Sequence, residues 1–317
     1  MLFWVARRIG ISVLLVWVVA TLVFLAIRLV PGDPAELLLT QGGAAPDPAA
    51  VQELRDQLGL DQPVLTQYAS NLARAVQGDL GFSVQDGSPV SDNIARRLPR
   101  TLELIGAAAV LAMLLGVPAG TIAAVRAGGL FDRAASALSA LALAVPVFVL
   151  GTLLVLLFAQ KLRWVAAGGY VSFAAAPGQH LLLVLMPALT IAAGLAAAVF
   201  RMTRAAVLDV AAQDWVRTAR AKGLGEGRIL LHHMLRNAVT PVVTVVALHM
   251  GSLLGGTVLV EYVFNWPGLS GMLVEAVSAR DYPEVVGIIL VISVLFVGLN
   301  LLLDFAYALL DPRVRHA

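Results

Sequence analysis

The chain has 317 residues, of which 59% are apolar and only 13% are charged, and its net charge is +2 at pH 7. Soluble domains average about 45–50% apolar and about 25% charged residues, so the charges are too few to cover a soluble globular surface. This composition argues against a solvated enzyme, a disordered tail or a nucleic-acid binder, and the lack of cysteine excludes disulfides, thiolate metal sites and cysteine nucleophiles.

Six stretches are apolar and long enough to cross a bilayer core, which needs about 20 residues per helix. Arg7 and Arg8 precede the first stretch as in a signal peptide, but its apolar run is longer and no small-residue cleavage site follows. We therefore expect a retained helix and predict an all-α polytopic membrane protein with six transmembrane helices. The predicted spans are residues 9–30, 101–125, 134–160, 180–200, 238–261 and 285–303.

The loops differ in their content of Lys and Arg, which concentrate on the cytoplasmic side of membrane proteins. Only Lys161, Arg163 and Arg280 lie in short loops on the second side, and the loop of about 70 residues after the first span largely escapes the rule. This asymmetry predicts that both termini are cytoplasmic. The residues on the cytoplasmic side are Arg7, Arg8, Arg126, Arg133, Arg201, Arg204, Arg217, Arg220, Lys222, Arg228, Arg236, Arg313 and Arg315.

The long external loop contains signals for two short amphipathic helices. Asp47-Pro48 is a helix start and Gly59 a helix stop, and residues 61–77 repeat this scheme with Gly78 as the stop. Apolar residues fall on one side of each helix. Two interpretations are compatible: a cap packed on the outer ends of the spans, and a docking surface for an external partner that uses the polar faces.

A second long loop, residues 201–237, lies on the cytoplasmic side. Residues 214–222 predict a short basic helix, Gly223-Leu224-Gly225 breaks it, and a second helix begins at Glu226. Small Ala219 and Ala221 would let another backbone approach closely. Such a helix–turn–helix knob suits transmission of force from a cytoplasmic partner, whereas the alternative is an ordinary solvated positive loop.

Several different short sequence motifs occur along nearly the whole chain. Arg217 to Leu224 resembles the coupling region of the permease subunits of ATP-binding-cassette (ABC) importers in the peptide and nickel subgroup, with Arg217 where other subgroups have a glutamate. Ser270 also departs from this family, which commonly has a glycine there. The other matching segments are Pro31-Gly32-Asp33-Pro34, Leu58-Gly59-Leu60-Asp61-Gln62-Pro63, Gly78-Asp79-Leu80-Gly81, residues 98–104, residues 235–238 with Pro241, residues 261–269, Arg280-Asp281-Tyr282-Pro283 and residues 311–315.

The resemblance implies a type I ABC importer permease fold of the first-permease type, with a large external loop after the first span. The expected organisation is a first segment and helix at 1–30, a helical external cap at 31–99, a five-helix transmembrane domain at 100–308 with a coupling region at about 211–228, and a tail at 309–317. The residues expected to couple to the ATPase are Trp215, Arg217, Ala219, Ala221, Lys222, Gly223, Leu224 and Arg228.

The same resemblance implies a chain that is no enzyme by itself, located in the bacterial cytoplasmic membrane. It implies a second homologous permease subunit, two cytoplasmic ATPase subunits that bind the ATP, and an external binding protein that delivers di- or oligopeptides or nickel and metal-chelate cargo. No Gly-x-x-x-x-Gly-Lys-Ser/Thr phosphate loop is present, and no cofactor or metal is expected in this chain. The alternative is a secondary transporter of a small solute driven by an ion gradient.

Several polar residues lie within or beside the predicted spans. Glu103, Glu261 and Asp304 fall near helix ends, where headgroups or water would reach them. His249 lies midway along the fifth span beside Met250, and these two residues are candidates to line the pathway, an interhelical hydrogen bond by His249 being the alternative. The remaining expectations are structural: Arg28 snorkels outward, Trp266 is an interfacial anchor, Gly255-Gly256 allows close helix contact, and His232 and His233 support their helix.

Overall fold

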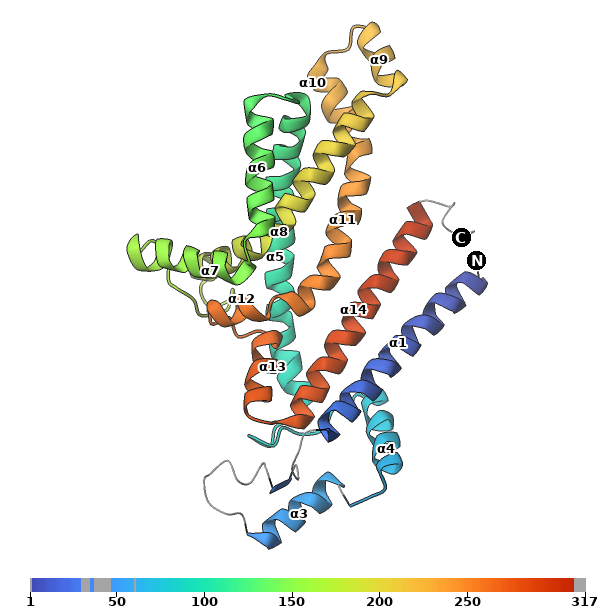
Figure 1. Cartoon of the computed structure of the whole chain (residues 1–317), viewed down its shortest axis with the longest axis vertical. Helices are drawn as coiled ribbons and strands as arrows, with labels where there is room; N and C mark the ends of the chain where they lie inside the picture. Colours follow the sequence, from blue (N-terminus) through green and yellow to red (C-terminus); the bar gives the residue numbers. More distant parts are fainter. Residues whose placement is uncertain (1, 30–34, 37–46, 60, 311–317) are drawn as a thin grey trace. The chain divides into compact units, whose positions relative to one another are not determined.

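The computed structural model describes residues 2–29, 35–36, 47–59 and 61–310. The motif at residues 31–34 and the segment 311–315 lie outside this range. The described chain is helical and contains one isolated β-bridge, between Phe82 and Pro89. Its longer helices are α1 (Leu2–Arg28), α3 (Pro48–Leu58), α4 (Val64–Val76), α5 (Val90–Val125), α6 (Leu130–Ala144), α7 (Val147–Leu154), α8 (Pro177–Ala211), α9 (Asp214–Ala221), α11 (Leu235–Gly256), α13 (Leu269–Ser278) and α14 (Tyr282–Leu310) (Figure 1).

Within the described residues, five helical segments are long and apolar enough to cross a membrane, and a bent pair of helices makes a sixth. The all-α polytopic class is therefore confirmed. The bent pair is the predicted third span, which is not one straight helix: its halves, Leu130–Ala144 and Val147–Lys161, meet at 105°. The break lies at Val145-Pro146 because Pro146 has no N–H to donate and disfavours a helical conformation at the residue before it.

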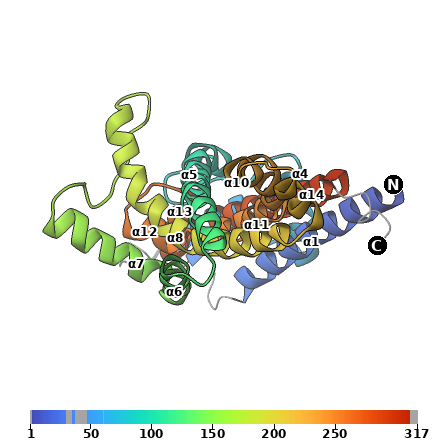
Figure 2. The ribbon, with the colours of Figure 1, turned by 90° about the horizontal axis from the view of Figure 1, so that it is seen from above.

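The chain divides into two compact units, of which the second comprises residues 100–267. Its main core is formed by buried side chains of α5, α8 and α11, such as Leu104, Leu195 and Val246. In Figure 2, α7 extends away from the bundle that α5, α6, α8 and α11 form. The second half of the bent span therefore extends outward from the bundle, although α7 still packs against α8.

Two glycines bring α5 and α8 into close contact. A Cβ atom added to Gly116 would lie 2.8 Å from the carbonyl oxygen of Ala196, and one added to Gly120 would lie 2.6 Å from that of Phe200. These residues form a Gly-x-x-x-Gly pair, the spacing that lets membrane helices approach closely. The close contact that we expected at Gly255-Gly256 is not seen within the described chain at Gly256, where an added Cβ would have no neighbour within 4 Å.

The other unit comprises residues 1–99 and 268–317. In it, α1 packs along α14, and Arg8 forms an ion pair with Asp304 at 2.7 Å. A small core joins the beginning of α5 to α13 and α14 through residues such as Val90, Met272 and Ile288. Asp281 is fully buried and accepts hydrogen bonds from the hydroxyl of Ser83 at 2.6 Å and the N–H of Val84 at 2.9 Å.

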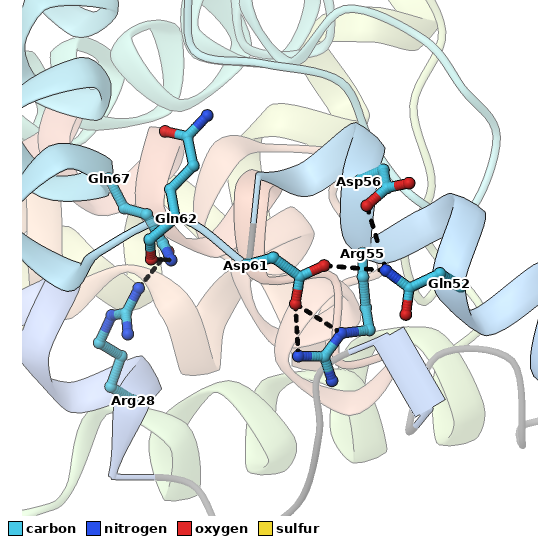
Figure 3. A network of polar contacts seen from close by, with 7 residues as sticks. All are labelled: Arg28, Gln52, Arg55, Asp56, Asp61, Gln62 and Gln67. Carbon is cyan, nitrogen blue, oxygen red and sulfur yellow. Dashed lines mark hydrogen bonds and ion pairs between the residues drawn. The ribbon is translucent and has the colours of Figure 1, made fainter.

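The external loop in this unit contains the two expected helices. Asp47 caps α3 by accepting a hydrogen bond from the N–H of Ala49, and Gly59 ends it in the left-handed conformation, as expected. The second helix begins at Val64 rather than at residue 61 and is preceded by Pro63. Asp61 instead lies in the turn between the helices, where hydrogen bonds from Arg55 and Gln52 hold its pKa below the ordinary value (Figure 3).

Candidate coupling and pathway sites

The segment after α8 folds into the predicted helix–turn–helix. Helix α9 ends at Ala221, and Gly223 follows with a φ of +77°, a backbone conformation that favours glycine. The N–H of Gly223 donates to the carbonyl of Arg220, and the N–H of Leu224 donates to that of Ala219. This pair of bonds is the Schellman arrangement, which satisfies the last carbonyl groups of a helix and reverses the chain sharply.

The inner side of this turn packs against other helices of the second unit. Val216 is fully buried in a cluster that includes Val207 of α8, Ile229 and Met234. Ile229 and Met234 belong to a π-helical segment, η3 (Ile229–Met234), which leads directly into α11. The turn is therefore packed against the end of α8 and continuous with α11.

An ion pair closes the turn from outside. The guanidinium of Arg220 donates to the carboxylate of Glu226 at 2.7 Å, and this bond raises the pKa of Arg220 above its ordinary value. Glu226 begins the short helix α10 (Glu226–Arg228). Glu226 was expected only as the start of the second helix; its ion pair had no distinct signal in the sequence, because Asp209 and Asp214 are further acidic residues of the same loop.

The eight residues expected to contact an ATPase do not all lie on one surface. Ala219 and Leu224 are half-buried and pack against the cluster around Val216. Ala219 therefore permits close packing inside the chain, where we had expected it to admit another backbone. The exposed members are Trp215, Arg217, Ala221, Lys222, Gly223 and Arg228.

His232 and His233 are neighbours on η3, and both are exposed. The ring of His233 lies 6.4 Å from that of Trp215, in an edge-on arrangement. No group of three His, Asp or Glu side chains suited to a metal ion occurs among the described residues.

The two candidate pathway residues lie on different sides of α11. His249 is exposed, and its Nδ1 lies 2.9 Å from the carbonyl oxygen of Val245 on the same helix. The interhelical hydrogen bond that we considered is thus replaced, within this chain, by a bond inside α11. Met250 is half-buried and packs against the main core of the second unit.

Two further expectations about polar residues are wrong. Glu261 is 1% exposed and accepts a hydrogen bond from the hydroxyl of Thr101 at 2.7 Å, so neither headgroups nor water solvate it. Trp266 is 2% exposed, and its indole N–H donates to the carbonyl of Arg100 at 3.1 Å. Both residues therefore join α5 to the segment after α11, because a buried polar group must find a partner within the protein.

A histidine for which no role was predicted lies beside Trp266, with ring centroids 6.2 Å apart. His180 is buried at the start of α8, with Nδ1 2.7 Å from the carbonyl oxygen of Val171 and Nε2 2.6 Å from the carboxylate of Glu103. Because a carbonyl only accepts, Nδ1 carries a proton, and a second proton must lie between Nε2 and the carboxylate. The one available signal was that both residues open predicted spans that start on the same side of the membrane.

Comparison with known proteins gives the class of this protein. The chain belongs to the family of binding-protein-dependent transport system inner membrane components: the model of that family matches residues 116–316, and the model of its N-terminal region matches residues 1–105. It is thus a permease subunit of an ABC importer, and an ion-gradient-driven carrier is not supported.

Particular relatives match over the whole length. The chain is 42% identical over 316 residues to the glutathione transport system permease protein GsiC of Escherichia coli (strain K12) and to the protein of the same name from Shigella dysenteriae serotype 1 (strain Sd197). In both cases the match covers all of this chain and all of the relative. The resemblance to the peptide and nickel subgroup is therefore confirmed.

Proposed function

We propose that the turn formed by α9 and α10 inserts into a cleft on a cytoplasmic ATPase subunit and transmits its movement to the membrane helices. The observation that carries this proposal is the two-sided construction of the turn. Its inner side is fixed by buried Val216, and its outer side presents Trp215, Arg217 and Lys222 to the surroundings. A rigid protrusion with an exposed surface is what force transmission between subunits requires.

The continuity of the backbone supports the same function. The turn passes through η3 into α11, and α11 packs extensively against α8. Because protein interiors are close-packed, a displacement of the turn is transferred to both helices rather than absorbed locally. Movement of an ATPase would in this way reach the spans that flank the transport pathway.

The proposed orientation puts both termini and the turn in the cytoplasm. It rests on the excess of Lys and Arg in the loops on that side. The external cap of α3 and α4 then lies on the side where a binding protein arrives. In this arrangement the exposed face of α11, with His249 and Leu248, meets either the partner permease or the cargo.

The proposed cargo is a small peptide. The relatives are named as permeases for glutathione, which is itself a short peptide, and the subgroup also includes nickel and metal-chelate importers. We propose that a second, different permease completes the pathway and that separate subunits bind and hydrolyse ATP. This chain then holds no cofactor and carries out no catalysis.

The proposal can be tested by cross-linking, because the chain has no cysteine of its own. Ala221→Cys places a thiol on the outer side of the turn, and Ala127→Cys places one in another exposed loop on the same predicted side of the membrane. In the intact transporter, a short thiol-reactive cross-linker should join Ala221→Cys, and not Ala127→Cys, to the ATPase. Equal cross-linking from both positions, or none from Ala221→Cys, would contradict the proposal.

A second variant tests coupling itself. Ala221→Trp adds a large side chain to the exposed surface and leaves the buried contacts of Val216 intact. We expect it to abolish binding-protein-stimulated ATP hydrolysis and uptake, whereas Ala127→Trp should retain both. Normal uptake by a correctly inserted Ala221→Trp transporter would show that the turn is a solvated loop.

A further inference from the structure

Helix α4 exposes an apolar surface that no described residue of its own unit covers. Leu65 and Val76 are 81% and 82% exposed, and together with Ala69 they lie within about 40° of one another around the helix, since each residue advances about 100°. We call these three residues the α4 strip. It carries no charge, and the polar side chains of α4, such as Ser70 and Arg74, lie on the opposite side.

The contacts of α4 with α1 show how deep this helix lies. The ring of Tyr68 packs edge-on against that of Phe24 with centroids 5.3 Å apart, and its hydroxyl is 2.7 Å from that of Thr21. The apolar segment of α1 suited to span the membrane runs from Val5 to Ala26. At about 1.5 Å per residue, Phe24 lies about 3 Å and Thr21 about 8 Å inside the end of that segment.

A polar contact marks the end of the apolar segment. Arg28, just beyond it, donates a hydrogen bond to Gln67 of α4 (Figure 3). Its guanidinium also lies over the ring of Phe24, 4.9 Å from the centroid. A cation at this position suits the phosphate level of a bilayer, where long basic side chains extend from buried stems. The side of α4 that carries Gln67 therefore lies at the headgroup level, and the side that carries Tyr68 lies at the level of the outermost hydrocarbon.

An exposed apolar surface of α1 lies at the same level. Leu22 and Leu25 of α1 are exposed beside the residues that hold Tyr68. A charge-free strip at the same depth would expose apolar area to water unless lipid covered it. Leaving this area in water costs a free energy of about 25 cal/mol per Å². Amphipathic helices that bind membranes bury their apolar sides by about 5–10 Å into this boundary.

We propose that α4 is an interfacial membrane helix whose strip of Leu65, Ala69 and Val76 is inserted between the lipids of the leaflet in which α1 ends. The helix thereby fixes the external cap to the bilayer surface next to the first span. This role is independent of the coupling function proposed above, since it concerns lipid contact and not ATP or cargo.

The experiment uses site-directed spin labelling of the complete transporter, with cysteines removed from the other subunits, in nanodiscs of phosphatidylcholine and phosphatidylglycerol. A nitroxide is attached to Leu65→Cys, to Val76→Cys or to the control Ser70→Cys, which is also exposed, on the opposite side of α4. Oxygen, which concentrates in lipid, and a neutral nickel chelate, which remains in water, then compete as relaxing agents. No transport measurement is involved.

We expect the ratio of oxygen to nickel collisions to be several-fold higher at Leu65→Cys and Val76→Cys than at Ser70→Cys. Equal ratios at all three positions would place the strip in water and overturn the proposal. Labels at 65 and 76 that are immobilised and shielded from both agents would show that a protein partner covers the strip, which also overturns it. Circular dichroism and transporter assembly, compared with the unlabelled protein, check that each labelled variant remains folded.

Discussion

Arg204 of α8 and Asp132 of α6 form an ion pair with two contacts: Nε lies 2.6 Å from Oδ1 and Nη2 lies 2.8 Å from Oδ2. Asp132 is buried and also accepts a hydrogen bond from the N–H of Gly128 at 2.8 Å. The planar guanidinium matches the carboxylate in a way that an ammonium group cannot. This pair therefore fixes the first half of the bent span to α8.

Replacing Arg204 by lysine should lower the melting temperature of the purified transporter, because one point charge cannot replace two directed hydrogen bonds. We expect a decrease of at least about 2 °C, measured by tryptophan fluorescence in detergent or nanodiscs. Arg133→Lys is the matched control, since Arg133 is exposed beside Asp132. Equal melting temperatures for the two variants would show that the second hydrogen bond between Arg204 and Asp132 does not contribute to stability.

The close packing of α5 on α8 predicts opposite effects for two glycines of the same helix. Gly120→Ala puts a methyl group 2.6 Å from the carbonyl oxygen of Phe200, which should destabilise the protein by about 1–3 kcal/mol. Gly106→Ala meets no atom within 4 Å, so the better helix propensity of alanine should be neutral or stabilising by up to about 1 kcal/mol. Denaturant or thermal unfolding measures the stability of both variants. An unchanged stability of Gly120→Ala would contradict the close packing of α5 on α8.

The loop before α8 gives a second steric prediction. A Cβ at Gly168 would lie 1.9 Å from the carbonyl oxygen of Phe264, whose backbone also accepts a hydrogen bond from Gly169 at 2.9 Å. Gly168→Ala should therefore displace this loop and lower the yield of folded protein, with a cost of about 3 kcal/mol or less. Limited proteolysis should cut the loop faster than in Gly178→Ala, where an added Cβ has no close neighbour.

The proton shared by His180 and Glu103 leads to a test with two substitutions. Glu103→Gln should be tolerated, because the amide can donate a hydrogen bond to neutral Nε2 in place of the shared proton. His180→Ala should cost about 1–3 kcal/mol, because it leaves the carbonyl of Val171 without its donor and removes a buried ring. Thermal unfolding compares the two, and a greater loss in Glu103→Gln than in His180→Ala would contradict the assignment.

Local signals in the sequence predict the parts of this fold that depend on local physics. The apolar stretches gave the helical membrane class, Asp47 and Gly59 gave the ends of α3, and the glycines at 223 and 225 gave the turn after α9. Each of these depends on backbone hydrogen bonding or on a left-handed residue within a few positions. The sequence contains that information directly.

Long-range partners were not predictable in the same way. Trp266 and Glu261 resemble solvated residues at the end of a span, but Arg100 and Thr101, more than 150 positions earlier, supply their hydrogen-bond partners. The spacing of apolar and polar residues along the chain cannot reveal pairs of residues that are so far apart in the sequence. For the same reason Ala219 was expected on the outer surface of the turn, although neighbours on η3 and α8 place it partly inside.

The elbow at Pro146 has a consequence for water in the membrane. Proline supplies no N–H to the carbonyl of Ala142 one turn earlier, although Val145 still donates to Leu141 at 3.0 Å. A carbonyl without a donor is costly in hydrocarbon, so we expect water or a donor from elsewhere in the assembly to satisfy the elbow. We therefore expect a polar partner, water or a neighbouring subunit, to reach the middle of the third span, which composition alone describes as mostly apolar.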